Sequence, residues 1–209
     1  ALMDERFIIR SLSPMETIGG CVVLDSNPIP IRKELKLWTA SLQESPSERI
    51  KQFVSQYWKS PKSLGNWARH FQTTESQVKN WIKSEEIKNE KGFLFTSEKR
   101  DESMEYIREV LTQFHKENPY KKSLSQDRLK DATHFSTNWL SYILDYMVDE
   151  LIKLEGGFAL KSHSVVLSDS DASLAKILED SVKQAGYAIL NAKELSSENP
   201  KITLEILYI

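Results

Sequence analysis

Basic side chains gather in one part of the chain at a spacing that suits contact with phosphates. Lys79 and Lys83 are four residues apart, so they share one face if this segment is helical. Ammonium and guanidinium groups bind phosphate oxygens and position a protein on nucleic acid without reading the bases. The candidate nucleic-acid contacts are therefore Arg69, Lys79, Lys83, Lys88 and Lys91.

An ordinary solvated surface is the alternative reading of these residues, because Glu85, Glu86 and Glu90 lie close by in the sequence. The chain as a whole carries 28 Lys and Arg against 30 Asp and Glu, a formal net charge of −2. This balance excludes an overall basic field of the kind that marks many nucleic-acid binders. Any basic patch must therefore be local.

Catalytic and cofactor patterns are missing from the sequence. The 7 glycines do not form a Gly-x-x-x-x-Gly-Lys-Ser/Thr phosphate loop, and the 4 histidines are dispersed without metal-ligand spacing. No serine–histidine or cysteine–histidine arrangement can be argued. We therefore expect no catalytic residue, metal site or cofactor in this chain, and we predict that the chain alone is not an enzyme.

Cysteine content and hydropathy indicate where the protein resides. Cys21 is the single cysteine, which excludes an intrachain disulfide and favours a reducing compartment. No apolar run approaches the ~20 residues that span a membrane, and the N-terminus lacks a signal-peptide pattern. These features predict a cytoplasmic protein without a membrane partner.

The candidate contacts fall in a segment with clear helix signals. Capping boxes at residues 45–48 and 74–77 open helices, with Pro46 at the first helical position. A further helix is predicted over residues 64–71, and the glycine turn at Gly92 joins two short strands. Three helices followed by a two-stranded wing predict a winged-helix module over residues 45–97.

An internal repeat predicts a second module. Residues 87–93 match residues 152–158 at an offset of 65, and both segments follow an amphipathic helical stretch. The second unit has a long helix over 98–116, a short helix capped by the stretch Ser123-Leu-Ser-Gln126, and a third helix after Ser136 whose inward side extends to Val148. This third helix is predicted to carry Asp145, Asp149 and Glu150 and no lysine or arginine, which disfavours phosphate contact there.

A third unit begins near Ser170. Its first helix is lined by Leu174, Ile177, Leu178 and Val182 and is capped by Gly186. Asn191 and Asn199 open two further short helices. The chain ends before a hairpin, so this third module is expected to be incomplete.

The N-terminal stretch predicts a β-hairpin, with strands at residues 7–9 and 21–24. A lone two-stranded hairpin is marginal in water, so we expect the chain to begin inside a domain. Residues 27–30 (Asn-Pro-Ile-Pro) predict an extended linker. A connecting helix is predicted over residues 31–42.

The amino-acid sequence of this hairpin resembles that of a known family. Arg10-Ser-Leu-Ser-Pro-Met-Glu-Thr-Ile-Gly-Gly20, followed by Val22-Val-Leu-Asp25, resembles the last strands of the third domain of selenocysteine-specific translation elongation factors. The family usually has a third glycine at the position of Cys21. These factors carry a string of winged-helix modules after their translation-factor domains, so the resemblance extends closely over residues 6–25 and 45–97 and loosely beyond Ser170.

The resemblance implies a fold and a domain organisation. The fold class is mainly α with small β wings, as tandem winged-helix modules preceded by a β-hairpin remnant of a translation-factor β-barrel domain. The expected segments are 1–26 (last barrel strands), 27–44 (linker and connecting helix), 45–97 (winged helix 1), 98–168 (winged helix 2) and 169–209 (winged helix 3, incomplete).

The resemblance also implies a function. The full-length family binds GTP and Mg and delivers selenocysteinyl-tRNA to the ribosome, and its last module grips an mRNA hairpin. This chain is expected to be the C-terminal arm that links these two parts, with the rest of the parent chain as a partner. Two alternatives remain open, a winged-helix DNA-binding transcription regulator and a protein-interaction scaffold.

Overall fold

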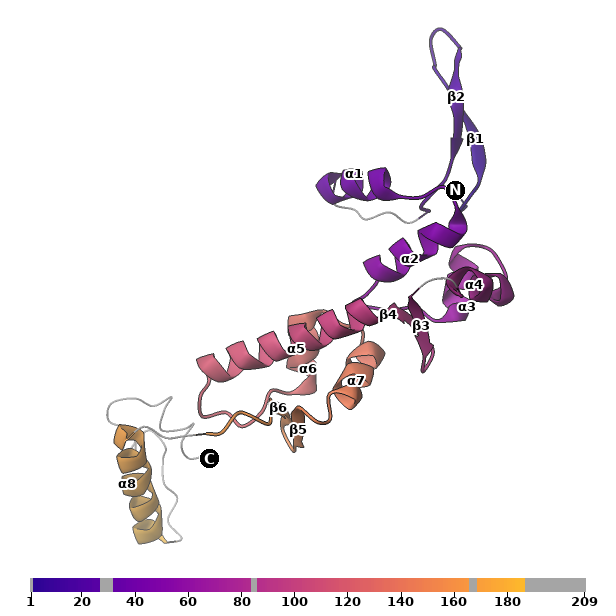
Figure 1. Cartoon of the computed structure of the whole chain (residues 1–209). Helices are drawn as coiled ribbons and strands as arrows, with labels where there is room; N and C mark the ends of the chain where they lie inside the picture. The colour runs from indigo at the N-terminus through magenta and orange to yellow at the C-terminus, as the bar shows by residue number, and fades with distance from the viewer. Residues whose placement is uncertain (1, 27–31, 84–85, 166–168, 187–209) are drawn as a thin grey trace. The chain divides into compact units, whose positions relative to one another are not determined.

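The computed structural model describes residues 2–26, 32–83, 86–165 and 169–186 (Figure 1). Within them the protein is mainly α-helical, with small antiparallel two-stranded sheets. The chain divides into two compact units, residues 1–103 and 104–209. The predicted linker at residues 27–30 lies outside the described residues.

The first unit begins with a hairpin of β1 (Arg6–Arg10) and β2 (Thr17–Val22). Ile8 pairs with Gly20 and Ile9 with Gly19, and a bulge follows Ile9. The prediction that the second strand starts at residue 21 was wrong. The two glycines lie in extended backbone and continue the ladder, so the strand starts four residues earlier.

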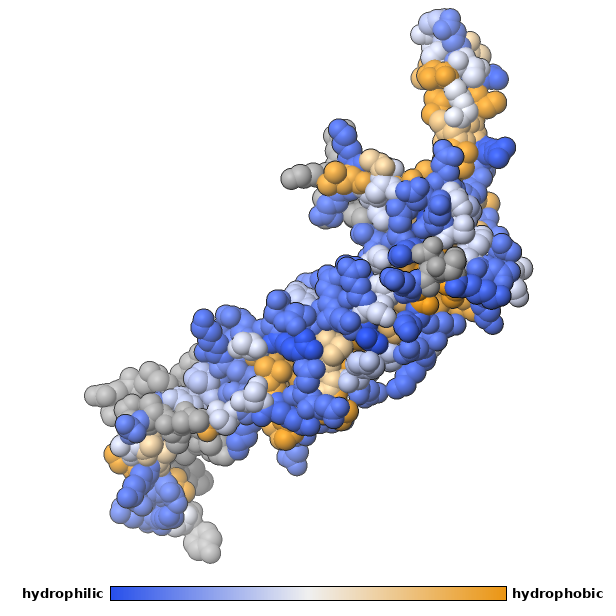
Figure 2. All heavy atoms as spheres, in the orientation of Figure 1, coloured by the Kyte–Doolittle hydropathy of each residue, from blue (hydrophilic) through white to orange (hydrophobic). Residues whose placement is uncertain are grey.

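Apolar side chains cover much of this hairpin's surface (Figure 2). Those exposed over at least 40% of their area on the strands and turn are Phe7, Ile8, Ile9, Leu12, Met15, Ile18 and Val22. Exposed apolar patches of this kind are typical of interaction surfaces.

Helices follow the hairpin in the order that the sequence predicts. They are α1 (Arg32–Ser41), α2 (Pro46–Gln56), α3 (Leu64–His70) and α4 (Glu75–Ile82), and then the hairpin β3 (Ile87–Glu90) and β4 (Phe93–Thr96). The Thr74 hydroxyl accepts a hydrogen bond from Gln77 N at 3.2 Å, which confirms that cap. The predicted capping bond at Ser45 was wrong. Ser45 lies at the N-cap position, but its hydroxyl shares a 2.7 Å hydrogen bond with Ser47 Oγ and caps no backbone N–H.

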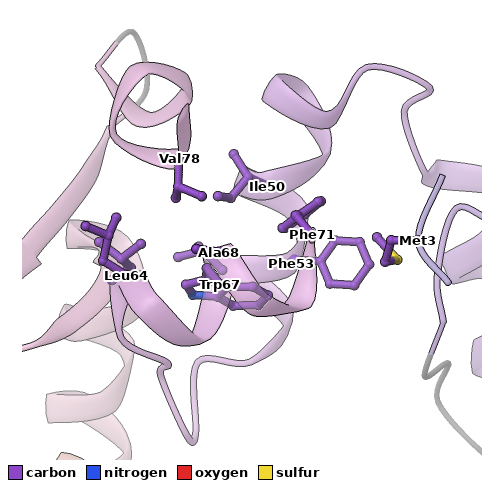
Figure 3. Close-up of a cluster of buried hydrophobic side chains, with 10 residues drawn as sticks. Met3, Ile50, Phe53, Leu64, Trp67, Ala68, Phe71 and Val78 are labelled. Carbon is purple, nitrogen blue, oxygen red and sulfur yellow. The ribbon is translucent and has the colours of Figure 1, made fainter. Parts of the chain in front are cut away.

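An apolar cluster holds these helices together (Figure 3). Phe53 and Trp67 are fully buried, and their rings meet edge to face at 6.1 Å. Met3, which precedes the first strand, points at Phe53 from the N-terminal segment. Burial of one large side chain of this kind contributes about 1.5–3 kcal/mol, so this cluster ties the N-terminal hairpin to the helices.

The long helix α5 (Ser97–Glu117) begins in the first unit and continues into the second. The second unit further contains α6 (Gln126–Thr133), α7 (Thr137–Tyr146), β5 (Leu151–Leu154), β6 (Gly157–Leu160) and α8 (Asp169–Ala185). Ile107, Trp139 and Leu140 are fully buried in it. Val148 was expected to face inward but is 64% exposed, because α7 ends at Tyr146 and helical spacing no longer governs the following turn.

The two later hairpins share a turn length but not a register. Glu90 pairs with Phe93, whereas Phe158, the sequence equivalent of Phe93, pairs with Lys153. The strand pairing of β5–β6 is therefore shifted by two residues relative to the pairing of the matching residues in β3–β4. Backbone bonds of 2.9 Å in both directions between Phe158 and Leu124 hold the second hairpin in its own position.

Helix α8 departs in part from the predicted pattern. Leu178 is buried, but Ile177 and Val182, expected on the same face, are 62% and 45% exposed. Gly186 has a φ of 58°, as expected for a C-terminal glycine cap. The two helices predicted after it lie outside the described residues.

Candidate nucleic-acid interface

Helix α4 displays two of the predicted contact residues. Val78 is fully buried and Trp81 packs against the core, which fixes the rotation of the helix. Lys79 and Lys83 are consequently exposed, one turn apart. Lys83 caps the C-terminal end of the helix, and its ammonium donates to Asn80 Oδ1 at 3.1 Å.

The other three predicted contacts lie on neighbouring elements of the same unit. Arg69 is exposed on α3, which packs against α4, and its guanidinium donates to Asn66 Oδ1. Lys88 is exposed on β3. Lys91 is exposed in the turn, where its φ of 45° and the φ of 84° at Gly92 match a type I′ turn.

This surface is mixed in charge. Glu86 and Glu90 are exposed beside the basic residues of the hairpin, and Glu75 lies in the first turn of α4. Glu85 lies outside the described residues. Point charges on a helix face and a hairpin tip can contact phosphates, but this arrangement offers no fixed set of donors for reading a base.

The acidic character predicted for the third helix of the second unit needs correction. Asp145 lies on α7, but Asp149 and Glu150 follow its end at Tyr146 and lie in the turn before β5. Glu150 also accepts bonds from Arg108, from Nε at 2.6 Å and from Nη2 at 3.1 Å. This bond to Arg108 holds the pKa of Glu150 below its usual range.

Two aromatic rings contact Lys62, which lies shortly before α3 in the chain. The Lys62 ammonium lies 4.0 Å from the ring centroid of Tyr57 and 5.0 Å from that of Trp67. Burial lowers the pKa of Lys62, and Asp25 acts in the opposite direction. Burial also lowers the pKa of His70, and the Lys62 charge lowers it further, against a raising effect of Asp25.

The structure shows a groove that the sequence did not reveal. It has a volume of about 460 Å³ and is bordered by α1, α2 and the start of α5. Trp38, Lys51, Trp58 and Lys99 line it. Trp67 is fully buried in the core, whereas helical spacing gives no signal for Trp58 because it follows the end of α2.

Metal and membrane features were also sought among the residues that the structure describes. No group of three or more His, Cys, Asp or Glu side chains there could hold a metal ion. In the same residues, no helix is long and apolar enough to cross a membrane.

Comparison with known proteins places the fold. No protein-family model matches the sequence, and no curated protein matches it. The crystal structure of the bacterial selenocysteine-specific elongation factor EF-Sec matches 100% of this chain, with a TM-score of 0.58 and 16% sequence identity. The two folds are related. The chain spans 33% of the length of that factor.

Proposed function

We propose that this chain is the C-terminal arm of a selenocysteine-specific elongation factor. In this role it links a body that binds GTP and selenocysteinyl-tRNA to a module that binds an mRNA hairpin at the ribosome, in the cytoplasm. The observation that carries the proposal is the fold likeness to EF-Sec over the whole chain. The residues of the N-terminal hairpin, which resemble the same family independently of the fold, support it.

The element order supports a tandem winged-helix reading of the arm. Helices α2, α3 and α4 followed by β3–β4, and helices α5, α6 and α7 followed by β5–β6, repeat one pattern. The bonds within the first unit suit a semi-rigid link, because the N-terminal segment is joined to the helices by packing and by hydrogen bonds. The proposal gives the arm a mechanical role and no reaction of its own.

Co-sedimentation of the full 209-residue chain with bacterial ribosomes tests this role. We expect binding at about 50 mM salt that weakens steeply toward about 200 mM, because phosphate contacts release counterions. Binding of the same chain to a duplex DNA of mixed sequence, measured at the same salt concentrations, is compared with its binding to ribosomes.

Two results would favour the alternatives. Tight, sequence-selective binding to duplex DNA would point to a transcription regulator. Capture of ribosomal proteins alone, unchanged by salt, would point to an interaction scaffold, since an apolar protein interface does not follow this salt dependence.

A further inference from the structure

The groove beside Trp58 is separate from the five predicted contact residues, since none of them lines it. We propose that this groove binds an unpaired nucleotide of a single-stranded nucleic acid. The base stacks on the Trp58 indole, and the flanking phosphates meet the lysines around it. The inference stands on the groove alone and does not depend on the proposed role of the arm.

Trp58 has the features of a stacking platform. It is half-buried, in contrast to Trp67 and Trp139, which are fully buried. The ammonium groups of Lys59 and Lys99 lie 5.4 and 5.5 Å from its ring centroid. A base has a π-face that stacks on an indole whatever its identity, and a displaced lysine is then within reach of the adjoining phosphate.

Other residues that line the groove are held in place by hydrogen bonds and packing. The Trp38 indole N–H donates to Asp25 Oδ2 at 2.8 Å, and its ring meets Phe53 edge to face at 5.3 Å. The Gln52 side chain donates to Ser41 O at 2.6 Å, which keeps α1 beside α2. A wall fixed by such bonds loses little freedom on binding, which favours affinity.

Charge favours a phosphate-bearing ligand. Lys51 and Lys99 line the groove, and none of the described residues that line it is acidic. Lys99 also pairs with Glu102 at 2.5 Å, but a partly exposed pair is weak and a phosphate can replace it. The volume of about 460 Å³ is within the range of small-ligand sites. An acidic peptide would use the lysines and leave the indole without a partner.

Fluorescence anisotropy of a labelled single-stranded RNA with the full chain tests the proposal. The competitors are the duplex form of the RNA and an abasic strand with the same sugar–phosphate backbone. We expect the single strand with bases to bind more tightly than both. Equal affinity for single-stranded DNA would also support stacking. Tighter binding of the RNA would in addition identify RNA as the ligand.

Trp58→Ala should weaken binding by about 5- to 150-fold, the range for loss of one stacked base. Trp58→Phe should restore most of the affinity, and Tyr146→Ala, which removes an exposed aromatic ring of the second unit, should leave it unchanged. Circular dichroism verifies that each variant is folded. Equal binding of the abasic strand or the duplex to the unmodified chain would overturn the proposal, as would no binding or a folded Trp58→Ala variant of full affinity.

Discussion

Arg49 and Asp4 join the N-terminal hairpin to the helices of the first unit. The Arg49 side chain is fully buried on α2, and its Nη2 donates to Asp4 Oδ1 at 2.5 Å. Its Nη1 donates to the carbonyls of Gln43 and Glu44 at 3.0 and 2.8 Å. A buried guanidinium is tolerated only with such partners, so this one residue fixes three segments at once.

Asp4→Ala should destabilise the first unit. The change leaves the buried Arg49 charge without its carboxylate, and we expect a loss of about 1–3 kcal/mol in the free energy of unfolding. Urea unfolding of the full chain measures it. Asp101→Ala, which removes the exposed partner of Arg100, is the matched control and should cost less than about 1 kcal/mol. Equal losses for both variants would show that the buried pair has no special role.

Acid should destabilise the second unit through His115. Its ring is buried and stacks on that of His163 with centroids 3.7 Å apart. Burial lowers the pKa of His115, and His163 lowers it further, against a raising effect of the Lys121 backbone. The unfolded chain therefore binds the proton more readily than the folded chain does. The free energy of unfolding has its full value above the ordinary histidine pKa of about 6.5 and decreases as the pH drops below it.

His115→Gln tests this linkage. Thermal unfolding between about pH 7.5 and pH 5 should show a smaller fall in midpoint temperature than the unmodified chain shows. His163→Gln should give an intermediate result, because it removes only the neighbouring charge. A pH dependence that is the same in all three proteins would contradict this assignment.

Gly157→Ala should disrupt the second hairpin. A Cβ at this position would lie 2.0 Å from Leu124 O, and the φ of 145° disfavours any side chain. We expect a loss of about 2–4 kcal/mol, from backbone strain and the clash together. Gly20→Ala meets nothing within 4 Å and should change stability by less than about 1 kcal/mol. Chemical unfolding of both variants distinguishes the two sites, and a neutral Gly157→Ala would refute the close approach to Leu124.

Lys79→Gln combined with Lys83→Gln tests the basic face of α4. If both ammonium groups contact phosphates, the log–log salt slope for single-stranded RNA should become shallower by about 1.4. The measurement is anisotropy over a salt series. An unchanged slope would mean that these side chains form only a solvated surface.

The local signals in the sequence predicted much of the first unit. The cap at Thr74 accepts the expected backbone bond, and Gly92 adopts the positive φ that its hairpin turn requires. These features depend on residues close in the chain. They could therefore be read without knowledge of the tertiary structure.

Features that depend on distant residues were not predicted. The register of β5–β6 depends on Leu124, which lies on a different segment, so the sequence repeat suggested a ladder that is two residues off. Burial of Arg49 has no periodic signal, because a charged residue normally marks the solvent side. Trp58 gained its position in a groove from the packing of α1 and α5, which spacing along the chain does not encode.

The coding sequence on both sides of these 209 residues gives the most direct test of the proposed function. The account predicts, in the same reading frame, an upstream Gly-x-x-x-x-Gly-Lys-Ser/Thr loop of a translation GTPase and further helix–hairpin units downstream. A start codon directly before Ala1 and a stop codon directly after Ile209 would contradict it. The chain would then act by itself, and the regulator or scaffold functions would replace that of an elongation-factor arm.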